Sequence, residues 1–434
     1  MARRTVVGFA GVALANLASA APASAGSPAS RRVTSDEFTA HVEPVVAVDP
    51  IDPRHLLAAC RVFIGSRIGV ATYHSDDGGL RWQALGLLPN LVPDACGNPT
   101  VGFDQEGRGY VCAVQATAAS RQGDALVWRF DSARNRFAQP VTAVSGGDGL
   151  ADHPSMVVAG RQPGAPATLH VVARLFGTAA DGLVITRSDD GGQTFQETHT
   201  LPFTGPAASA PVLAVGESGT LCVLYTTPSP TGALAVCATT SHDRGATFQP
   251  AQTLVEIQET VPNLSPLSAR SVPALAALDE RGAFCAVTTA FDEATGVSRL
   301  MAIPFRGLNN RSQETAVDVA TSSDTIYLQP QIASNNEHIA ITVYALSLST
   351  RLMDVLLFQA PAPRAATFDL RFRPPVGLTS TPFDPLQAVD TGDSPWLGNY
   401  QGLTTGPDQS FHPVWTDTRN GTAQIFTARQ IPCH

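Results

Sequence analysis

The sequence has few charged residues and no cluster of positive ones. Of its 434 residues 15% are charged, the net charge at pH 7 is −9, and no run of Lys or Arg follows the N-terminal segment. Proteins that bind nucleic acids present Lys/Arg patches to the phosphates. The composition therefore argues against a nucleic acid as partner.

Long hydrophobic runs are missing too. After the N-terminus no segment reaches the roughly 18 apolar residues of a membrane span. At the N-terminus Arg3 and Arg4 precede a short apolar stretch at 6–17 and small residues at 18–20 and 23–25. This order predicts a signal peptide at 1–25 and a secreted or periplasmic protein without a membrane span. A twin-Arg signal is the alternative, which the following residues match less well.

Motifs for metals and phosphates are also absent. The sequence has no H-x-x-x-H or C-x-x-C pair and no glycine-rich phosphate loop after a strand. We therefore expect no metal and no cofactor. The loop GGDGLADH at 146–153 offers Asp148, Asp152 and His153 to Ca²⁺, but it lacks the ordered ligand spacing of a calcium loop and is typical of a plain turn.

The cysteine count is odd. In an oxidising compartment some of the seven cysteines should pair, leaving at least one over. Cys222 and Cys237 flank the turn-rich stretch TTPSPTG, and counting outward from its centre predicts a disulfide between them. The alternative is that all seven are small buried hydrophobic residues, above all those in apolar runs. The seven are Cys60, Cys96, Cys112, Cys222, Cys237, Cys285 and Cys433.

Most of the chain consists of a repeat. Each copy has a residue before a proline, an apolar alternation, a polar turn and a second apolar run, and successive prolines are 55 to 62 residues apart. The last copy lacks the proline. The copies begin with EPVVAV at 43, NPTVGF at 98, HPSMVV at 153, APVLAV at 210, VPALAA at 272, QPQIAS at 329 and NYQGLT at 399.

Each copy has room for four strands arranged as two hairpins. Proline fits the first position of a strand, where its missing N–H is not needed, so we expect each proline to mark the start of a unit's first strand. Helical periodicity is almost absent, and four-stranded sheets bury both faces only by packing side by side in a ring. The sequence therefore predicts an all-β fold: a seven-bladed β-propeller of four-stranded antiparallel blades in a single domain, 33–434.

The last copy shows only three strands. The segment SDEFTAHV at 35–42 precedes the first proline and belongs to no other unit. We expect this N-terminal strand to complete the last blade, so that both ends of the chain lie in one sheet.

A shorter phrase, S-x-D-x-G-x-T/R-F/W, recurs at 75–82, 188–195 and 241–248. Its Ser and Asp bond backbone N–H groups in a turn, its glycines take a conformation costly for other residues, and its aromatic residue packs between sheets. We expect a structural clip from Ser75, Asp77, Gly78, Gly79 and Trp82, from Ser188, Asp190, Gly191, Gly192 and Phe195, and from Ser241, Asp243, Gly245 and Phe248.

These clips resemble the Asp boxes, or BNR repeats, of the sialidase superfamily, and FDSARNRF at 130–137 resembles an eroded copy. The resemblance covers nearly the whole chain after the signal as architecture. It implies that the boxes are structural and lie on the face opposite the substrate.

The same resemblance implies candidates for catalysis. Retaining sialidases bind the substrate carboxylate with three arginines, attack through a Tyr activated by a Glu, and use an Asp as the acid. The match makes Tyr400 the nucleophile and Asp94 or Asp152 the acid, and Arg270 one clamp. The family's first arginine is replaced by Val42, which argues against sialidase activity. Other clamp candidates, for which a solvated surface position is the alternative, are Arg61, Arg67 and Arg174.

The repeat itself predicts a second constellation at one mouth of the central channel. Polar groups with an aromatic platform suit a sugar; the alternative is that they bond one another and water. Residues expected there from the repeat are Glu43, Asn98, His153, Ala210, Val272, Gln329, Asn399 and Tyr400, and the loops add Asp94, Asp152, Arg270, Asp393 and Trp396.

These features favour recognition of a carbohydrate or glycoconjugate at the mouth by a monomeric protein, with or without glycoside hydrolase activity. An exo-sialidase with Tyr400 as nucleophile is one alternative. A non-catalytic scaffold for a protein partner is the other.

Overall fold

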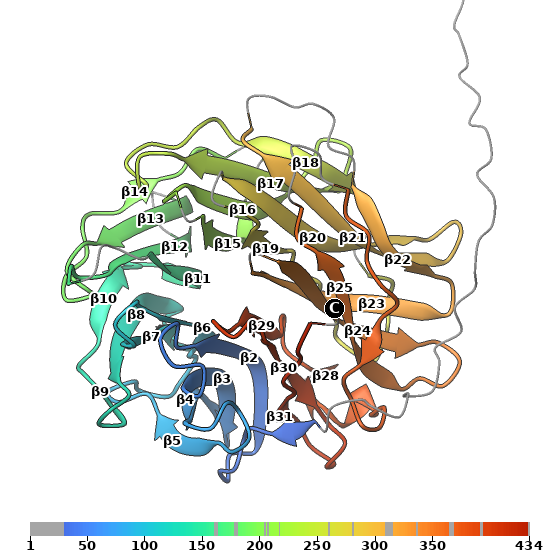
Figure 1. The fold of residues 1–434 in the computed structure, drawn as a ribbon, viewed down its shortest axis with the longest axis horizontal. Helices are drawn as coiled ribbons and strands as arrows, with labels where there is room; N and C mark the ends of the chain where they lie inside the picture. The colour runs from blue at the N-terminus through green and yellow to red at the C-terminus, as the bar shows by residue number, and fades with distance from the viewer. Residues whose placement is uncertain are drawn as a thin grey trace, which may run out of the picture.

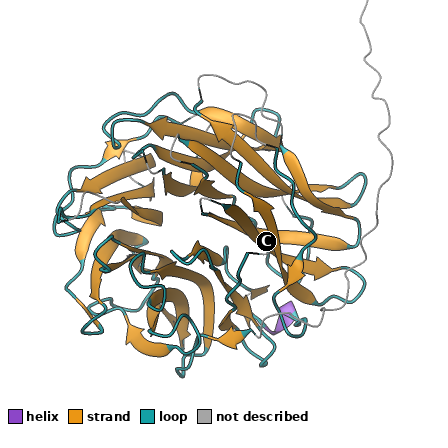
Figure 2. Ribbon diagram, viewed as in Figure 1, coloured by secondary structure: helices purple, strands orange, loops and turns teal. Residues whose placement is uncertain are grey.

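The computed structural model describes residues 30–432 except 160–163, 178–180, 204, 206–207, 217, 259–260, 280–281, 309–315, 336, 364–368 and 391–393. The predicted signal peptide, Asp393 and Cys433 lie outside the described residues. The described part is all-β apart from one 3₁₀ turn, Pro385–Gln387 (Figure 2). It has no helix long and apolar enough to cross a membrane.

The described strands form five four-stranded antiparallel sheets, one nine-stranded sheet and one two-stranded sheet. The nine-stranded sheet consists of two groups, β6 to β10 and β11 to β14, joined by one parallel pair between Leu150 and Gly123.

The bounds follow the order of the sheets along the chain. The first sheet has β2 (Ala40–Val48), β3 (Leu56–Ile64), β4 (Arg67–Ser75) and β5 (Gln83–Leu87). The nine-stranded sheet has β6 (Gly97–Phe103), β7 (Gly109–Thr117), β8 (Gln122–Asp131), β9 (Arg136–Phe137), β10 (Val141–Val144), β11 (Leu150–Ala159), β12 (Thr168–Phe176), β13 (Gly182–Ser188) and β14 (His199–Thr200). The next sheet has β15 (Ser209–Val215), β16 (Leu221–Pro228), β17 (Leu234–Ser241) and β18 (Gln252–Ile257).

Two further sheets follow, with β19 (Ala274–Ala277), β20 (Ala283–Asp292), β21 (Val297–Arg306) and β22 (Val317–Ser322), and with β23 (Thr325–Ser334), β24 (His338–Ser347), β25 (Met353–Pro361) and β26 (Val376–Gly377). The short hairpin is β27 (Val389–Asp390) and β28 (Pro395–Trp396). The last sheet has β29 (Gly402–Thr405), β30 (Phe411–Asp417), β31 (Gln424–Thr427) and β1 (Arg31–Arg32).

The sheets follow one another around a common centre, in chain order from blue to red (Figure 1). The first strands of successive groups contact each other from β2 through β6, β11, β15, β19 and β23 to β29, and β29 contacts β2. Apolar clusters lie between neighbouring sheets; one joins Leu224 of β16 to Phe284 of β20. Burying such a side chain contributes about 1.5–3 kcal/mol, so packing between sheets stabilises this arrangement.

The N-terminal strand of the last sheet is not the predicted segment 35–42. Instead, Arg31 and Arg32 of β1 pair with Thr427 and Phe426 of β31. The carboxylate of Asp36 accepts hydrogen bonds from the backbone N–H of Phe38 and from the Tyr73 hydroxyl of β4, which turns the chain toward the first sheet. The end of the predicted segment, residues 40–42, is therefore the beginning of β2 and pairs with β3.

Most of the repeat prolines lie inside strands, not at their first position. Pro44, Pro99, Pro154, Pro211 and Pro330 each follow a residue at which the pairing register of the first strand shifts. Such a β-bulge leaves a backbone N–H outside the ladder, which is where a strand tolerates proline. The fifth copy comes nearest to the prediction, because there Pro273 lies directly before β19, one residue ahead of the first position of the strand.

The three Asp boxes form the predicted turns. In the third box the N–H of Gly245 donates to Ser241 Oγ (2.8 Å), the Ser241 hydroxyl donates to Asp243 Oδ1 (2.8 Å), and the N–H of Thr247 donates to the same oxygen (2.9 Å). The other two boxes repeat these contacts. Their aromatic residues pack against apolar clusters: Trp82, Phe195 and Phe248.

The predicted disulfide between Cys222 and Cys237 is wrong. In the hairpin Cys222 faces Thr240 and Cys237 faces Tyr225, because the turn is centred farther along the chain than the sequence suggested. The offset of three residues places the two thiols on opposite faces of the sheet, where Cys222 packs toward β20 and Cys237 toward β12. The described cysteines are buried, as the alternative expected.

Candidate ligand site at the bulges before proline

The five bulges share a backbone conformation that L-residues rarely adopt. The residue before the proline has a φ between 48° and 56° at each of them. The left-handed region costs an L-residue about 1–2 kcal/mol, and such strain gathers at functional sites. The residues are Glu43, Asn98, His153, Ala210 and Gln329. These five, with Asn399, Tyr400 and Gln401 of the last copy, are called the mouth below.

Asp152 joins two bulges of the mouth. Its Oδ1 accepts from the Asn98 amide (2.6 Å) and from the backbone N–H of His153 (2.8 Å), and its Oδ2 lies 3.0 Å from Nδ1 of the His153 ring. Burial opposes both charges, but hydrogen bonding and attraction between the two side chains outweigh it. The pKa of Asp152 is therefore lowered and the pKa of His153 raised, which favours an ion pair.

Glu43 is the buried charge of the mouth. Its side chain is fully buried, its Oε1 accepts from the Asn399 amide (3.0 Å), and its Oε2 lies 3.6 Å from Nη1 of Arg61. The guanidinium of Arg61 lies 5.4 Å from the centroid of the Trp396 ring, and Trp396 is only 9% exposed. Trp396 therefore packs against the guanidinium of Arg61 and exposes little of its ring to a ligand.

Tyr400 reaches across the mouth from the last copy of the repeat. Its hydroxyl donates to the carbonyl oxygen of Pro99 (3.4 Å). Burial raises the pKa of Tyr400 well above its ordinary value, and the nearby carboxylate of Glu43 raises it further. The phenol is therefore neutral at physiological pH.

The amides of the mouth are fixed by their NH₂ groups. Gln329 Nε2 donates to the carbonyl oxygen of Gly398 (2.5 Å), and Gln401 Nε2 donates to the carbonyl oxygen of Gln329 (2.8 Å). The Asn98 amide donates to Asp152, as described above. The oxygens of these three amides make no hydrogen bond within the described part of the chain. Within the mouth, the buried oxygens that have no hydrogen-bond partner among the described residues are Glu43 Oε2, Asn98 Oδ1, Gln329 Oε1 and Gln401 Oε1.

The sequence candidates differ in how they relate to the mouth. Arg270 is exposed and close enough to His153 for its charge to oppose protonation of that ring. Asp94 Oδ2 accepts from the backbone N–H of Ala118 (3.1 Å), in the turn between β7 and β8. Val42 is fully buried beside Ala40 and Trp396.

The other arginines considered as clamps point to other partners. Arg174 lies 3.6 Å from Asp181 and packs on the ring of Phe176 (4.7 Å). Arg67 is exposed at the start of β4. The structure thus brings Arg61 into the mouth and Arg270 near it.

The loop considered for Ca²⁺ is a turn held by a backbone hydrogen bond of its own and by the carboxylate of Asp124. The N–H of Gly149 donates to Gly146, and the N–H of Gly146 donates to Asp124. Asp152 of this loop contacts Asn98 and His153. In the described part of the chain no three His, Cys, Asp or Glu residues are placed to hold a metal ion.

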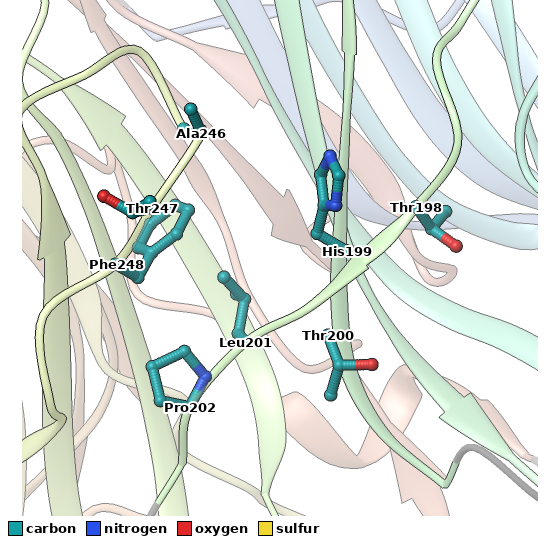
Figure 3. A pocket seen from close by; sticks show the side chains of 9 residues that line it. Thr198, His199, Thr200, Leu201, Pro202, Ala246, Thr247 and Phe248 are labelled. Carbon is teal, nitrogen blue, oxygen red and sulfur yellow. The ribbon is translucent and has the colours of Figure 1, made fainter.

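A cavity of about 710 Å³ lies away from the mouth, beside the third Asp box (Figure 3). Its lining includes His199 and Phe248 but no carboxylate or guanidinium. In an antiparallel sheet the turn between third and fourth strands lies at the opposite end from the start of the first strand. The cavity is therefore at the other end of the sheets from the mouth, and it gathers no acid–base pair.

Sequence reasoning missed Gln401 and Gly398 and named Arg61 only as a clamp candidate, not as the partner of Glu43. Gln401 follows the aligned position of a copy that lacks its proline, so the proline rule did not single it out. Gly398 approaches Glu43 so closely that a Cβ there would lie 2.9 Å from Glu43 Cγ. The sequence signal that could have revealed this contact was a glycine directly before Asn399, the start of the last copy.

Comparisons with known proteins give distant likenesses. No family model and no curated protein matches the chain. Among solved structures, the NanB sialidase of Streptococcus pneumoniae has a TM-score of 0.45 at 11% identity and covers 72% of this chain and 67% of its own. An α-L-arabinofuranosidase of Fusarium graminearum with arabinobiose has 0.47 at 10%, covering 93% and 97%. An α-L-arabinanase of Penicillium chrysogenum with arabinobiose has 0.44 at 12%, covering 73% and 94%.

Proposed function

We propose that this chain is an exported, monomeric seven-bladed β-propeller that binds a carbohydrate or glycoconjugate at the mouth. The contact of β29 with β2 and the pairing of β1 with β31 support a closed ring of blades. The N-terminal sequence at 1–25 supports export.

The observation that carries the proposed function is the surplus of polar atoms at the mouth. Four buried oxygens there have no hydrogen-bond partner in the described part of the chain. An unpaired buried polar group costs about 1–3 kcal/mol, so these positions favour a ligand that supplies hydrogen bonds. Sugars supply many such hydrogen bonds per unit of surface. The strained backbone of the bulges holds the acceptors of Glu43, Asn98 and Gln329 in place.

A glycan array with the purified protein tests this function. We expect binding that is lost in Asn98→Ala and kept in Asp318→Asn, an exposed substitution on β22. Melting temperatures of both variants establish that they fold. Binding unchanged in Asn98→Ala would move the site away from the mouth.

An exo-sialidase is the second candidate, because the Glu43 carboxylate lies near enough to Tyr400 for its charge to raise the pKa of the phenol. A Tyr nucleophile needs such a base to take its proton. The buried Val42 at the first clamp position opposes this candidate, since it leaves the substrate carboxylate without that arginine.

Release of umbelliferone from a sialyl-umbelliferone substrate decides between binding and hydrolysis. A sialidase would lose turnover in Tyr400→Phe. Equal turnover by the unaltered protein and by Tyr400→Phe, or no turnover by either, would reject Tyr400 as the nucleophile.

A further inference from the structure

The unpartnered buried atoms of the eight mouth residues are all of one kind, although Arg61 beside them also keeps its buried Nε–H without a hydrogen-bond partner among the described residues. Glu43 Oε2, Asn98 Oδ1, Gln329 Oε1 and Gln401 Oε1 are hydrogen-bond acceptors. Their residues are 9% exposed or less. Each of the three amides already uses one N–H within the protein: Asn98 donates to Asp152, Gln329 to Gly398, and Gln401 to the backbone of Gln329. A ligand that fits must therefore bring donors.

The positive groups of the mouth are paired. Arg61 lies beside Glu43, and the ring of His153 lies beside Asp152. Arg270 is exposed, where water and salt screen its attraction for an anion. The Nε–H of Arg61 has no hydrogen-bond partner among the described residues, but the charge of Arg61 is paired with that of Glu43. The buried part of the mouth thus has no unpaired charge among the described residues to receive a carboxylate, and Glu43 would repel one.

We propose that the mouth selects a neutral sugar over an acidic one. Hydroxyl groups of the sugar donate to the four unpartnered oxygens. The carboxylate of an acidic sugar carries only acceptors and a charge of the same sign as Glu43. This inference rests on the proposed carbohydrate function and adds the class of sugar to it.

A cation is the other ligand that oxygen acceptors attract. Ca²⁺ takes six to eight oxygen ligands, commonly including several carboxylates. Here one carboxylate and three amide oxygens are left over, and in the described residues no acidic cluster gathers at this point. The arrangement suits hydroxyl donors better.

Isothermal titration of the whole chain with matched sugars tests the inference. The probes are galactose and galacturonate, glucose and glucuronate, which differ only at C6, together with arabinobiose and N-acetylneuraminate. We expect at least one neutral probe to bind at least tenfold more tightly than its acidic counterpart. We also expect Glu43→Gln, which exchanges one acceptor for a donor, to lose at least tenfold in affinity for it.

Two controls accompany the titration. Glu197→Gln makes the same change at an exposed position between β13 and β14 and should leave affinity within twofold. Gln401→Met removes a different unpartnered oxygen and should weaken binding too, so that the test does not depend on the folding of one variant. Melting curves establish that each variant is folded.

The outcomes distinguish a failure of this inference from a failure of the proposed carbohydrate binding. Tighter binding of an acidic probe than of its neutral partner would overturn the inference and leave carbohydrate recognition standing. Binding of Ca²⁺ alone that disappears in Glu43→Gln would overturn the inference as well. If no sugar of either class binds the folded protein, the proposed function itself fails.

Discussion

The Asp-box turns and the bulges before proline are two repeated polar features of one chain, at opposite ends of its sheets. In the boxes the serine and aspartate oxygens bond the turn that contains them, as at Ser241 and Asp243. At the bulges Asn98 and Gln329 use their NH₂ groups and keep their oxygens unpartnered among the described residues. The hydrogen-bond inventory, more than the residue types, thus separates a structural repeat from a candidate site.

The largest expected difference between the two ends concerns a pair of aspartates. Asp152 and Asp243 each accept a backbone N–H through Oδ1, at 2.8 and 2.9 Å. Asp152→Ala should lower affinity for a bound sugar at least 100-fold, because Asn98 and His153 lose their common partner. Asp243→Ala should leave affinity within twofold while lowering the free energy of unfolding by about 1 kcal/mol. Titration calorimetry and urea unfolding measure both; equal losses of affinity would break the distinction.

Ser241→Ala sharpens the comparison from the box side. Without the hydroxyl the N–H of Gly245 and the carboxylate of Asp243 lose a partner, so the free energy of unfolding should fall by about 1–2 kcal/mol. Urea denaturation measures the loss. A stability equal to that of the unaltered protein would show that the clip does not stabilise the fold.

Ala210→Gly tests the strain at the bulges. Ala210 has a φ of 49°, which glycine adopts readily, so the variant should gain up to about 1 kcal/mol in the free energy of unfolding. The control Ala276→Gly, on the regular strand β19, should lose about 0.5–1 kcal/mol. The two variants should change the free energy of unfolding with opposite signs. A loss of stability in both would argue against a left-handed conformation at Ala210.

The smallest expected effect is a pH dependence. The hydroxyl and N–H of Thr247 lower the pKa of Asp243 to about 2. A folded pKa below the unfolded value gives stability that is present above about pH 4 and lost as the pH falls toward 2. In Asp243→Asn the melting temperature should fall less steeply over that range than in Asp318→Asn, a substitution on exposed β22. Identical slopes of melting temperature against pH in the two variants would show that Asp243 of the box does not contribute to the pH dependence of stability.

The sequence predicted much of this architecture, because local chemistry decides it. The Asp boxes depend on side chains within eight residues of one another, and the turns at Ser75, Ser188 and Ser241 formed as predicted. The repeat also identified the residues before the prolines, five of which share one left-handed conformation.

The errors came from choices that local chemistry leaves open. A proline is tolerated both at the start of a strand and at a bulge within it, and only pairing with β3 decides for Pro44. The centre of the turn between Cys222 and Cys237 depends on strand register, which a turn-rich stretch fixes only to within a few residues. The position of the closing strand depends on Asp36, whose partner Tyr73 lies 37 residues away.

A crystal structure of the protein with a bound neutral saccharide is the most direct measurement. Sugar hydroxyls within about 3 Å of Glu43 Oε2 and Gln401 Oε1 are the predicted result. A saccharide seated in the cavity beside the third Asp box, with the oxygens of the mouth bonded only to water, would contradict the account.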